Sequence, residues 1–183
     1  LLSPDSSKPF GAQRNGLVLG EAVAALRLSS REASNWKILG GANVVDGSQP
    51  TGASLAAVTS MYQRALASSG LTAEQIDLIK VQAAGSPGND AIEAQGMLAA
   101  FSTLPALVSL KAAMGHTMGA SGAAEIALLI ACMEQGVLPV YADAVDATLG
   151  VEFAQNIPES MRHIMATILG FGGSHATVVL EKA

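Results

Sequence analysis

Two residues with chemical potential, Lys111 and His116, lie in the stretch SLKAAMGHTMGASG (109–122), whose other side chains are small, apolar or hydroxyl-bearing. A histidine can donate a hydrogen bond or transfer a proton near neutral pH. A buried lysine needs a carboxylate partner, and the nearest candidates are Asp90 and Glu93, one helical turn apart. The alternative is a histidine buried for packing, with its ring bonded to a backbone carbonyl.

The elements around this pair are predicted to bring it to the end of a strand. A strand over 106–110 leads to Lys111, and an apolar helix over 119–135, rich in Ala and Gly, follows His116. Small residues let a helix approach another backbone closely. A strand over 77–82 and a helix over 90–101, with Asp90 at its favourable N-terminus, complete the setting.

The remaining segments indicate an α/β domain with layered helices on a mixed sheet. Helical spacing predicts a helix over 53–69 that Gly70 ends, and Thr72 with Gln75 forms a candidate capping box. The sequence GFGGS joins two β-rich runs as a hairpin-like turn. The other expectations are a strand over 38–45, two short strands or a bend over 17–28, an edge or connection over 137–140, and β-rich runs over 162–169 and 176–180. His163, near the start of the run over 162–169, is expected to be a surface or strand-end residue.

Composition excludes several classes of function. We expect one domain over 1–183. Half of the residues are hydrophobic, 14% are charged and the mean hydropathy is +0.38. Because this is rich in apolar residues for a domain exposed to water, we expect a partner or further chain to cover part of the surface. The net charge is −5 without a basic stripe, which argues against nucleic acid. No apolar run reaches the roughly 18–20 residues of a membrane span.

The same composition gives no sign of a metal or other cofactor. A single cysteine, Cys132, excludes an internal disulfide and a multi-cysteine metal site, and no carboxylate spacing joins His116, His163 and His175 into a metal set. The chain opens with LLSPDSSKPF, without Met or a signal peptide. We therefore expect a fragment of a cytoplasmic protein.

The segment around His116 resembles the Lys–His segment of the β-ketoacyl synthases of the thiolase superfamily. That motif is Ser-x-Lys-x-x-x-Gly-His-Thr-x-Gly-Ala-x-Gly, and 109–122 matches each fixed position. Three further segments of the family are similar to stretches of this chain, namely KPFGAQRNGLVLGEA, GLTAEQIDLIKVQA and ILGFGGSHATVVLEK. The resemblance covers nearly the whole chain and implies the C-terminal half of a thiolase-like αβαβα fold.

The resemblance also implies a chemistry. In the family a cysteine thiolate takes an acyl group from a carrier-protein thioester, and the enolate formed by malonyl decarboxylation attacks it. Two histidines donate to the malonyl thioester oxygen. On this basis His116 is the second histidine, Lys111 its electrostatic support and Glu93 the partner of Lys111. Leu169, Phe171 and Gly172 belong to the substrate and oxyanion-hole segment, with the Leu169 N–H as a donor.

Departures from the pattern point to a degenerate site. The family nucleophile lies upstream of the Pro-Phe segment and is absent here. The first-histidine motif of the family is His-Gly-Thr-Gly-Thr-x-x-Gly-Asp-x-x-Glu, and the corresponding stretch here is AAGSPGNDAIE. In this comparison Ala84 stands at the position of the histidine, and the loop from Ala84 to Asp90 is two residues shorter than in the family. Leu169 replaces the gating phenylalanine and His175 the usual asparagine. The altered loop resembles chain-length factors, although these usually lose the Gly-His motif that is intact here.

Two functions are therefore predicted. The chain is part of a synthase-like protein of fatty-acid or polyketide biosynthesis, with acyl carrier protein as partner and a degenerate site; whether it is an active acyltransferase stays open. The alternative is a non-elongating, chain-length-factor-like protein that pairs with an active ketosynthase. The family implies a homodimer or a heterodimer with another ketosynthase, and a missing N-terminal half.

Overall fold

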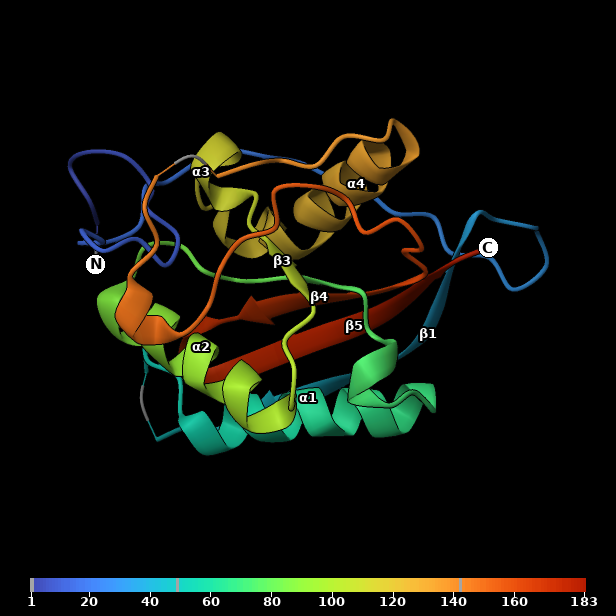
Figure 1. The fold of residues 1–183 in the computed structure, drawn as a ribbon, viewed down its shortest axis with the longest axis horizontal. Coiled ribbons are helices and arrows are strands. Elements are labelled where there is room, and N and C mark those ends of the chain that lie inside the picture. Colours follow the sequence, from blue (N-terminus) through green and yellow to red (C-terminus); the bar gives the residue numbers. More distant parts are fainter. Residues whose placement is uncertain (1, 49, 142) are drawn as a thin grey trace.

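The computed structural model describes residues 2–48, 50–141 and 143–183 and forms a mixed five-stranded sheet between two layers of helices. Figure 1 shows α1 and α2 on one face of the sheet, with α3 and α4 on the other. This confirms the predicted α/β layering. The main elements are β1 (Trp36–Val45), α1 (Leu55–Ser69), β2 (Leu78–Lys80), α2 (Pro87–Ala100), β3 (Ala106–Val108), α3 (Lys111–Met114), α4 (Ser121–Glu134), β4 (His163–Leu169) and β5 (Ser174–Lys182).

The strand order is β1-β5-β4-β2-β3. The pairs β1–β5 and β4–β5 are antiparallel, whereas β2 pairs in parallel with both β4 and β3. The predicted hairpin is confirmed, with the 3₁₀ turn Phe171–Gly173 between β4 and β5. The parallel strands β2 and β3 end at the same edge of the sheet, so the residues that follow them lie close together.

Alternation along β2 divides the core into two parts. Leu78 packs with the α4-side cluster, while Ile79 packs with the larger cluster beneath α1 and α2. Lys80 has the same parity as Leu78, so its side chain is directed to the α3 and α4 side although it is only 1% exposed. The sheet therefore carries a lysine into an otherwise apolar interior.

The helices begin and end largely where local signals predict. Ser54 caps α1 through a bond from the Ala57 N–H, and Gly70 ends it in the left-handed conformation (φ 70°). The Thr72–Gln75 capping box is present at the 3₁₀ turn Ala73–Gln75. The helix α2 begins at Pro87, three residues before the predicted Asp90, because proline fits the first helical turn.

The segment 17–28 differs from its prediction. It forms no regular strand pair; Leu17 bridges to Leu2, and Leu19 bridges to His116. Val23 and Leu28 are exposed apolar side chains (101% and 74%). Two further 3₁₀ turns, Met118–Ala120 and Ala147–Leu149, complete the described elements. Residues 137–140 form a connection without regular secondary structure. No helix among the described residues is long and apolar enough to span a membrane.

Candidate functional site

The backbone of His116 is held by the N-terminal segment. Its N–H donates to the Val18 carbonyl (2.7 Å), and its carbonyl accepts from the Gly20 N–H (3.0 Å). This approach requires glycine, because a Cβ at position 20 would lie 2.0 Å from the Met114 carbonyl oxygen. Gly115 supplies the turn before His116 with φ 69°. The small residues around the histidine therefore serve a close backbone crossing.

The His116 ring has a different partner at each nitrogen. Nδ1 accepts from the Met118 backbone N–H (3.0 Å) and lies 3.2 Å from Ser121 Oγ. Nε2 lies 3.0 Å from the side-chain amide nitrogen of Gln82. Burial, with the positive charges of Lys111 and Lys80, lowers the pKa of His116 to about 4. The ring is therefore neutral at physiological pH.

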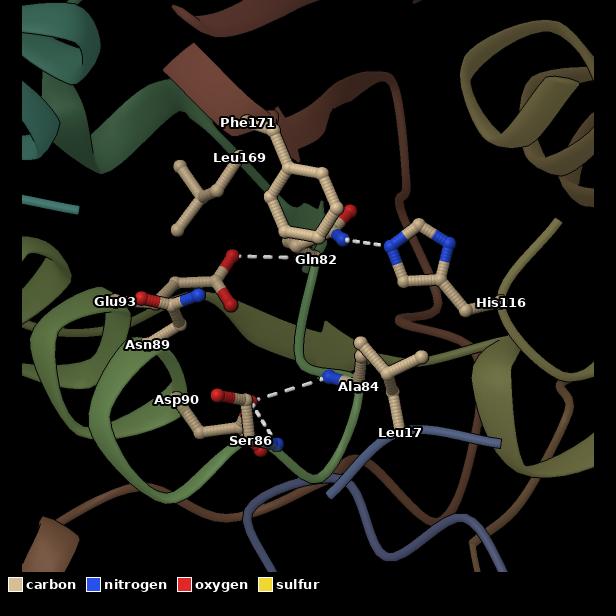
Figure 2. Close-up of a pocket in the computed structure, with 10 residues that line it drawn as sticks. All are labelled: Leu17, Gln82, Ala84, Ser86, Asn89, Asp90, Glu93, His116, Leu169 and Phe171. Atoms are coloured by element: carbon tan, nitrogen blue, oxygen red, sulfur yellow. Dashed lines mark hydrogen bonds between the residues drawn. The ribbon is translucent and has the colours of Figure 1, made fainter. Parts of the chain in front are cut away.

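Gln82, and not Ala84, is the residue whose side chain faces His116. Figure 2 shows the amide directed at the ring, while Ala84 contributes its backbone N–H to Asp90. The family motif places its histidine 11 positions before the glutamate. Counted back from Glu93 without a gap, this position is Gln82, whereas a loop two residues shorter places Ala84 there. Ala84 lines the same pocket, but its methyl group offers His116 no hydrogen bond, so its assignment as the degenerate first-histidine position stays a prediction. A gap-free count from Asp90 and Glu93 would have found Gln82 in the sequence.

The carboxylates of α2 hold the loop after β2 by its backbone. Glu93, fully buried, accepts from the N–H groups of Gln82 (2.7 Å) and Ala83 (2.8 Å). Asp90 accepts from the N–H groups of Phe10, Ala84, Gly85 and Ser86 at 2.9–3.2 Å. Burial raises the pKa of Asp90 to about 6 and that of Glu93 to about 7, and these bonds oppose the rise. The two carboxylates fix the chain that carries Gln82.

Lys111 pairs with Glu125, which corrects the predicted pairing with Glu93. Both oxygens of Glu125 are used, because Lys80 contacts the second one at 2.5 Å. All three side chains are at most 1% exposed. Burial lowers the pKa of both lysines, whereas the carboxylate of Glu125 in contact with them favours their charged forms. A carboxylate between apolar residues of a helix signals a buried cation partner, and Glu125 in α4 was such a signal.

The β4–β5 turn closes the site from the other side. The side chains of Leu169 and Phe171 line a small pocket together with Gln82 and His116 (Figure 2). Phe171 is 48% exposed. The Gly172 N–H donates to the Pro50 carbonyl (2.7 Å), so it is not a free donor for a substrate oxygen.

The pocket combines a neutral histidine and an amide with apolar and polar walls. Both groups can donate hydrogen bonds, so the arrangement can bind a carbonyl or a developing oxyanion. The other lining residues are Leu17, Ala84, Ser86, Asn89, Asp90, Glu93, Leu169 and Phe171. Lys111 is paired with Glu125 and does not line the pocket, so it affects the site through its charge, which lowers the pKa of His116. His163 lies apart, at the start of β4, with Nδ1 2.9 Å from the Gln75 carbonyl. The described residues hold no group of three or more metal-ligating side chains.

Comparison with known proteins finds a family model and curated proteins that match this chain. A model described as "Beta-ketoacyl synthase, C-terminal domain" matches residues 37–144, more than half of the chain. NorC, a spectinabilin polyketide synthase system protein of Streptomyces orinoci, is 32% identical over all of this chain and 9% of its own length. The mitochondrial 3-oxoacyl-[acyl-carrier-protein] synthase of Arabidopsis thaliana is 30% identical over 97% of this chain and 43% of its own.

Solved structures share the fold. The ishigamide ketosynthase/chain length factor has a TM-score of 0.87 at 23% identity and covers all of this chain with 48% of its own. The ketosynthase from module 6 of the bacillaene synthase of Bacillus subtilis 168 has a TM-score of 0.85 at 22% identity, covering all of this chain and 38% of its own. The chain spans about a tenth of the length of NorC and under half of the Arabidopsis enzyme.

Proposed function

The chain belongs to the β-ketoacyl synthase family as its C-terminal domain, and we propose that it is part of a synthase-like protein that binds acyl or malonyl thioesters in fatty-acid or polyketide assembly. The observation that carries this is the neutral His116, held by three backbone bonds with its Nε2 at the pocket wall beside Gln82. In this role His116 donates to the thioester oxygen as negative charge develops there.

The site is degenerate in one respect. Gln82 can donate a hydrogen bond to an oxygen, but an amide does not accept or release a proton at neutral pH. The family nucleophile is not among these residues, because the single cysteine, Cys132, lies within α4. The 183 residues alone are therefore expected to give no ketoacyl product from acyl and malonyl carrier proteins.

The second candidate function is that of a non-elongating partner of an active ketosynthase, similar to a chain-length factor. His116 is the single histidine in the described pocket lining, and the Gln82 amide faces it where a second histidine would be needed, which favours this function. In this case the pocket shapes the bound acyl chain and does not catalyse decarboxylation. For either function we propose two partners, an acyl carrier protein and a second synthase subunit, and a cytoplasmic location. The exposed apolar side chains of Val23 and Leu28 support a further chain that covers this surface.

A matched pair of histidine variants separates the two functions. In the protein joined to the N-terminal half of the family fold, His116→Ala should lower malonyl decarboxylation about a hundredfold or more if the site is catalytic. His163→Ala, at the start of β4 away from the pocket, serves as the control. If His116→Ala leaves the rate unchanged and alters product length, the partner function is supported. Thermal unfolding of both variants shows whether either effect comes from misfolding.

A further inference from the structure

The hydrogen atoms of the His116–Gln82 pair can be assigned from their neighbours. A backbone N–H can only donate, and the Met118 N–H donates to His116 Nδ1 at 3.0 Å. Ser121 Oγ, 3.2 Å from the same nitrogen, can donate as well. Nδ1 is therefore an acceptor, and in a neutral imidazole the proton then belongs to Nε2. The low pKa of His116 agrees with a neutral ring.

This assignment conflicts with the orientation of the Gln82 amide. The protonated Nε2 would face the amide NH₂ at 3.0 Å, which places two donors against each other. At the same time Gln82 Oε1 is buried and has no hydrogen-bond partner among the described residues. The oxygen and nitrogen of a glutamine amide have nearly the same shape, and their positions are assigned from the hydrogen-bond network. Half a turn of the amide removes the donor–donor contact.

We propose that in the empty site the Gln82 carbonyl oxygen accepts the His116 Nε2–H bond and so acts as an internal substitute for the ligand oxygen. The amide NH₂ then takes the buried position that Oε1 occupies, in the wall of the pocket that Phe171 and Leu169 also line. A ligand oxygen that reaches Nε2–H must displace the amide oxygen. If the amide turns as it is displaced, its NH₂ becomes a second donor to the same ligand oxygen.

This exchange makes Gln82 a specificity-determining residue. A neutral carbonyl oxygen replaces one ordinary hydrogen bond with another, whereas an oxygen that carries negative charge gains two stronger, charge-assisted bonds. The site should therefore prefer an enolate-like oxygen to a ground-state thioester. The choice of a thioester-derived ligand rests on the proposed function, whereas the hydrogen bond within the empty pair does not.

The hydrogen bond is tested by ¹⁵N NMR of the full chain with labelled histidine. The sequence contains three histidines, so His116 is assigned by the signal that disappears in His116→Gln. We expect His116 to be neutral with its proton on Nε2. A proton on Nδ1 in the unliganded protein would overturn the proposal, because Gln82 would then be the donor.

Two variants identify the partner of that proton. Gln82→Met keeps much of the side-chain volume but has no amide, and the Nε2 proton should exchange with solvent at least about tenfold faster while the tautomer stays the same. Gln82→Glu places a carboxylate at the same point and should raise the pKa of His116 by about one unit or more. An Nε2 proton that both variants leave unaffected would show that Gln82 is not its acceptor.

Titration with malonyl-phosphopantetheine separates this proposal from the proposed function. Binding should shift both the His116 ring signals and the Gln82 side-chain NH₂ signals, and the response of the NH₂ should be lost in Gln82→Met. If no signal responds although the tautomer and the variants behave as expected, the thioester function is wrong and the internal hydrogen bond stands. If the His116 signals respond without those of Gln82, the exchange of the amide is wrong.

Discussion

Buried carboxylates from the two helix layers serve opposite purposes at this site. Asp90 and Glu93 on α2 accept backbone N–H groups and fix the course of the loop over 82–86. Among the described residues, Glu125 on α4 accepts no hydrogen bond from a backbone N–H and instead holds the ammonium groups of Lys80 and Lys111. The first arrangement positions Gln82, and the second keeps positive charge behind His116.

This difference shows how one pocket combines shape with electrostatics. Bonds from backbone amides stabilise a carboxylate without adding mobile charge, so α2 determines geometry. A carboxylate shared by two lysines leaves the group of three with one net positive charge when all three are ionised. That charge opposes protonation of His116 and keeps the ring in the form that can donate to an oxyanion.

The largest effect is expected from breaking the lysine cluster. Glu125→Gln would leave Lys80 and Lys111 without their buried counter-ion, and removal of one partner of a buried pair typically lowers stability by about 3–5 kcal/mol. Urea unfolding measures this loss. As the control, the triple variant Lys80→Met, Lys111→Met, Glu125→Leu should lose much less, because it leaves no unpaired charge. A Glu125→Gln protein as stable as the wild type would contradict the cluster.

A smaller loss is expected from the backbone-binding carboxylates. Asp90→Asn replaces one acceptor oxygen with an NH₂ group, so some of the four N–H groups lose their partner, at a cost of about 1–3 kcal/mol. Hydrogen exchange of the Ala84, Gly85 and Ser86 amides should accelerate in the same variant. Exposed Asp5→Asn is the matched control. Unchanged exchange at these amides would mean that the Asp90 bonds do not hold the loop.

The pH dependence of stability isolates His116. Its pKa is lowered from the ordinary 6.5 to about 4, so the unfolded chain binds a proton first as the pH falls. Its contribution to stability is complete above about pH 6.5 and is lost as the pH falls through 4. The free energy of unfolding of His116→Gln should fall less steeply with decreasing pH than that of the wild type. The loss of stability that His116 causes in acid should be smaller than the loss caused by Asp90→Asn, because solvent screens the ring. Equal acid slopes for the two proteins would disprove it.

The smallest change in stability is expected for Lys80→Met. Glu125 keeps Lys111 as its partner, so the free energy of unfolding should change by about 1 kcal/mol or less. The pKa of His116 should nevertheless rise, because one of the two nearby positive charges is removed. NMR titration of the ring measures the shift, and Lys37→Met, an exposed lysine, is the control. A His116 pKa that does not move would limit the electrostatic role to Lys111.

Much of the fold was predictable because its signals are local. Helical spacing gave α1, and apolar β-rich runs with a glycine turn gave β4 and β5. The segment 17–28 was harder to predict, because its bridges to Leu2 and His116 depend on partners far from it in space and sequence. The predicted start of α2 at Asp90 is three residues late, because Asp90 does lie in the first turn but that turn begins at Pro87.

The sequence by itself determined the family, the layered α/β class and the place of His116 in a small-residue turn, because residue spacing records these directly. A count along the motif points to Gln82, but only the tertiary structure decided that its amide faces His116 and that Glu125 is the carboxylate that meets Lys111. Glu125 lies 14 residues after Lys111 and 45 after Lys80, and the packing of α4 against the sheet brings all three together. Such pairings depend on which face of a helix or strand is turned inward, and local sequence does not fix that.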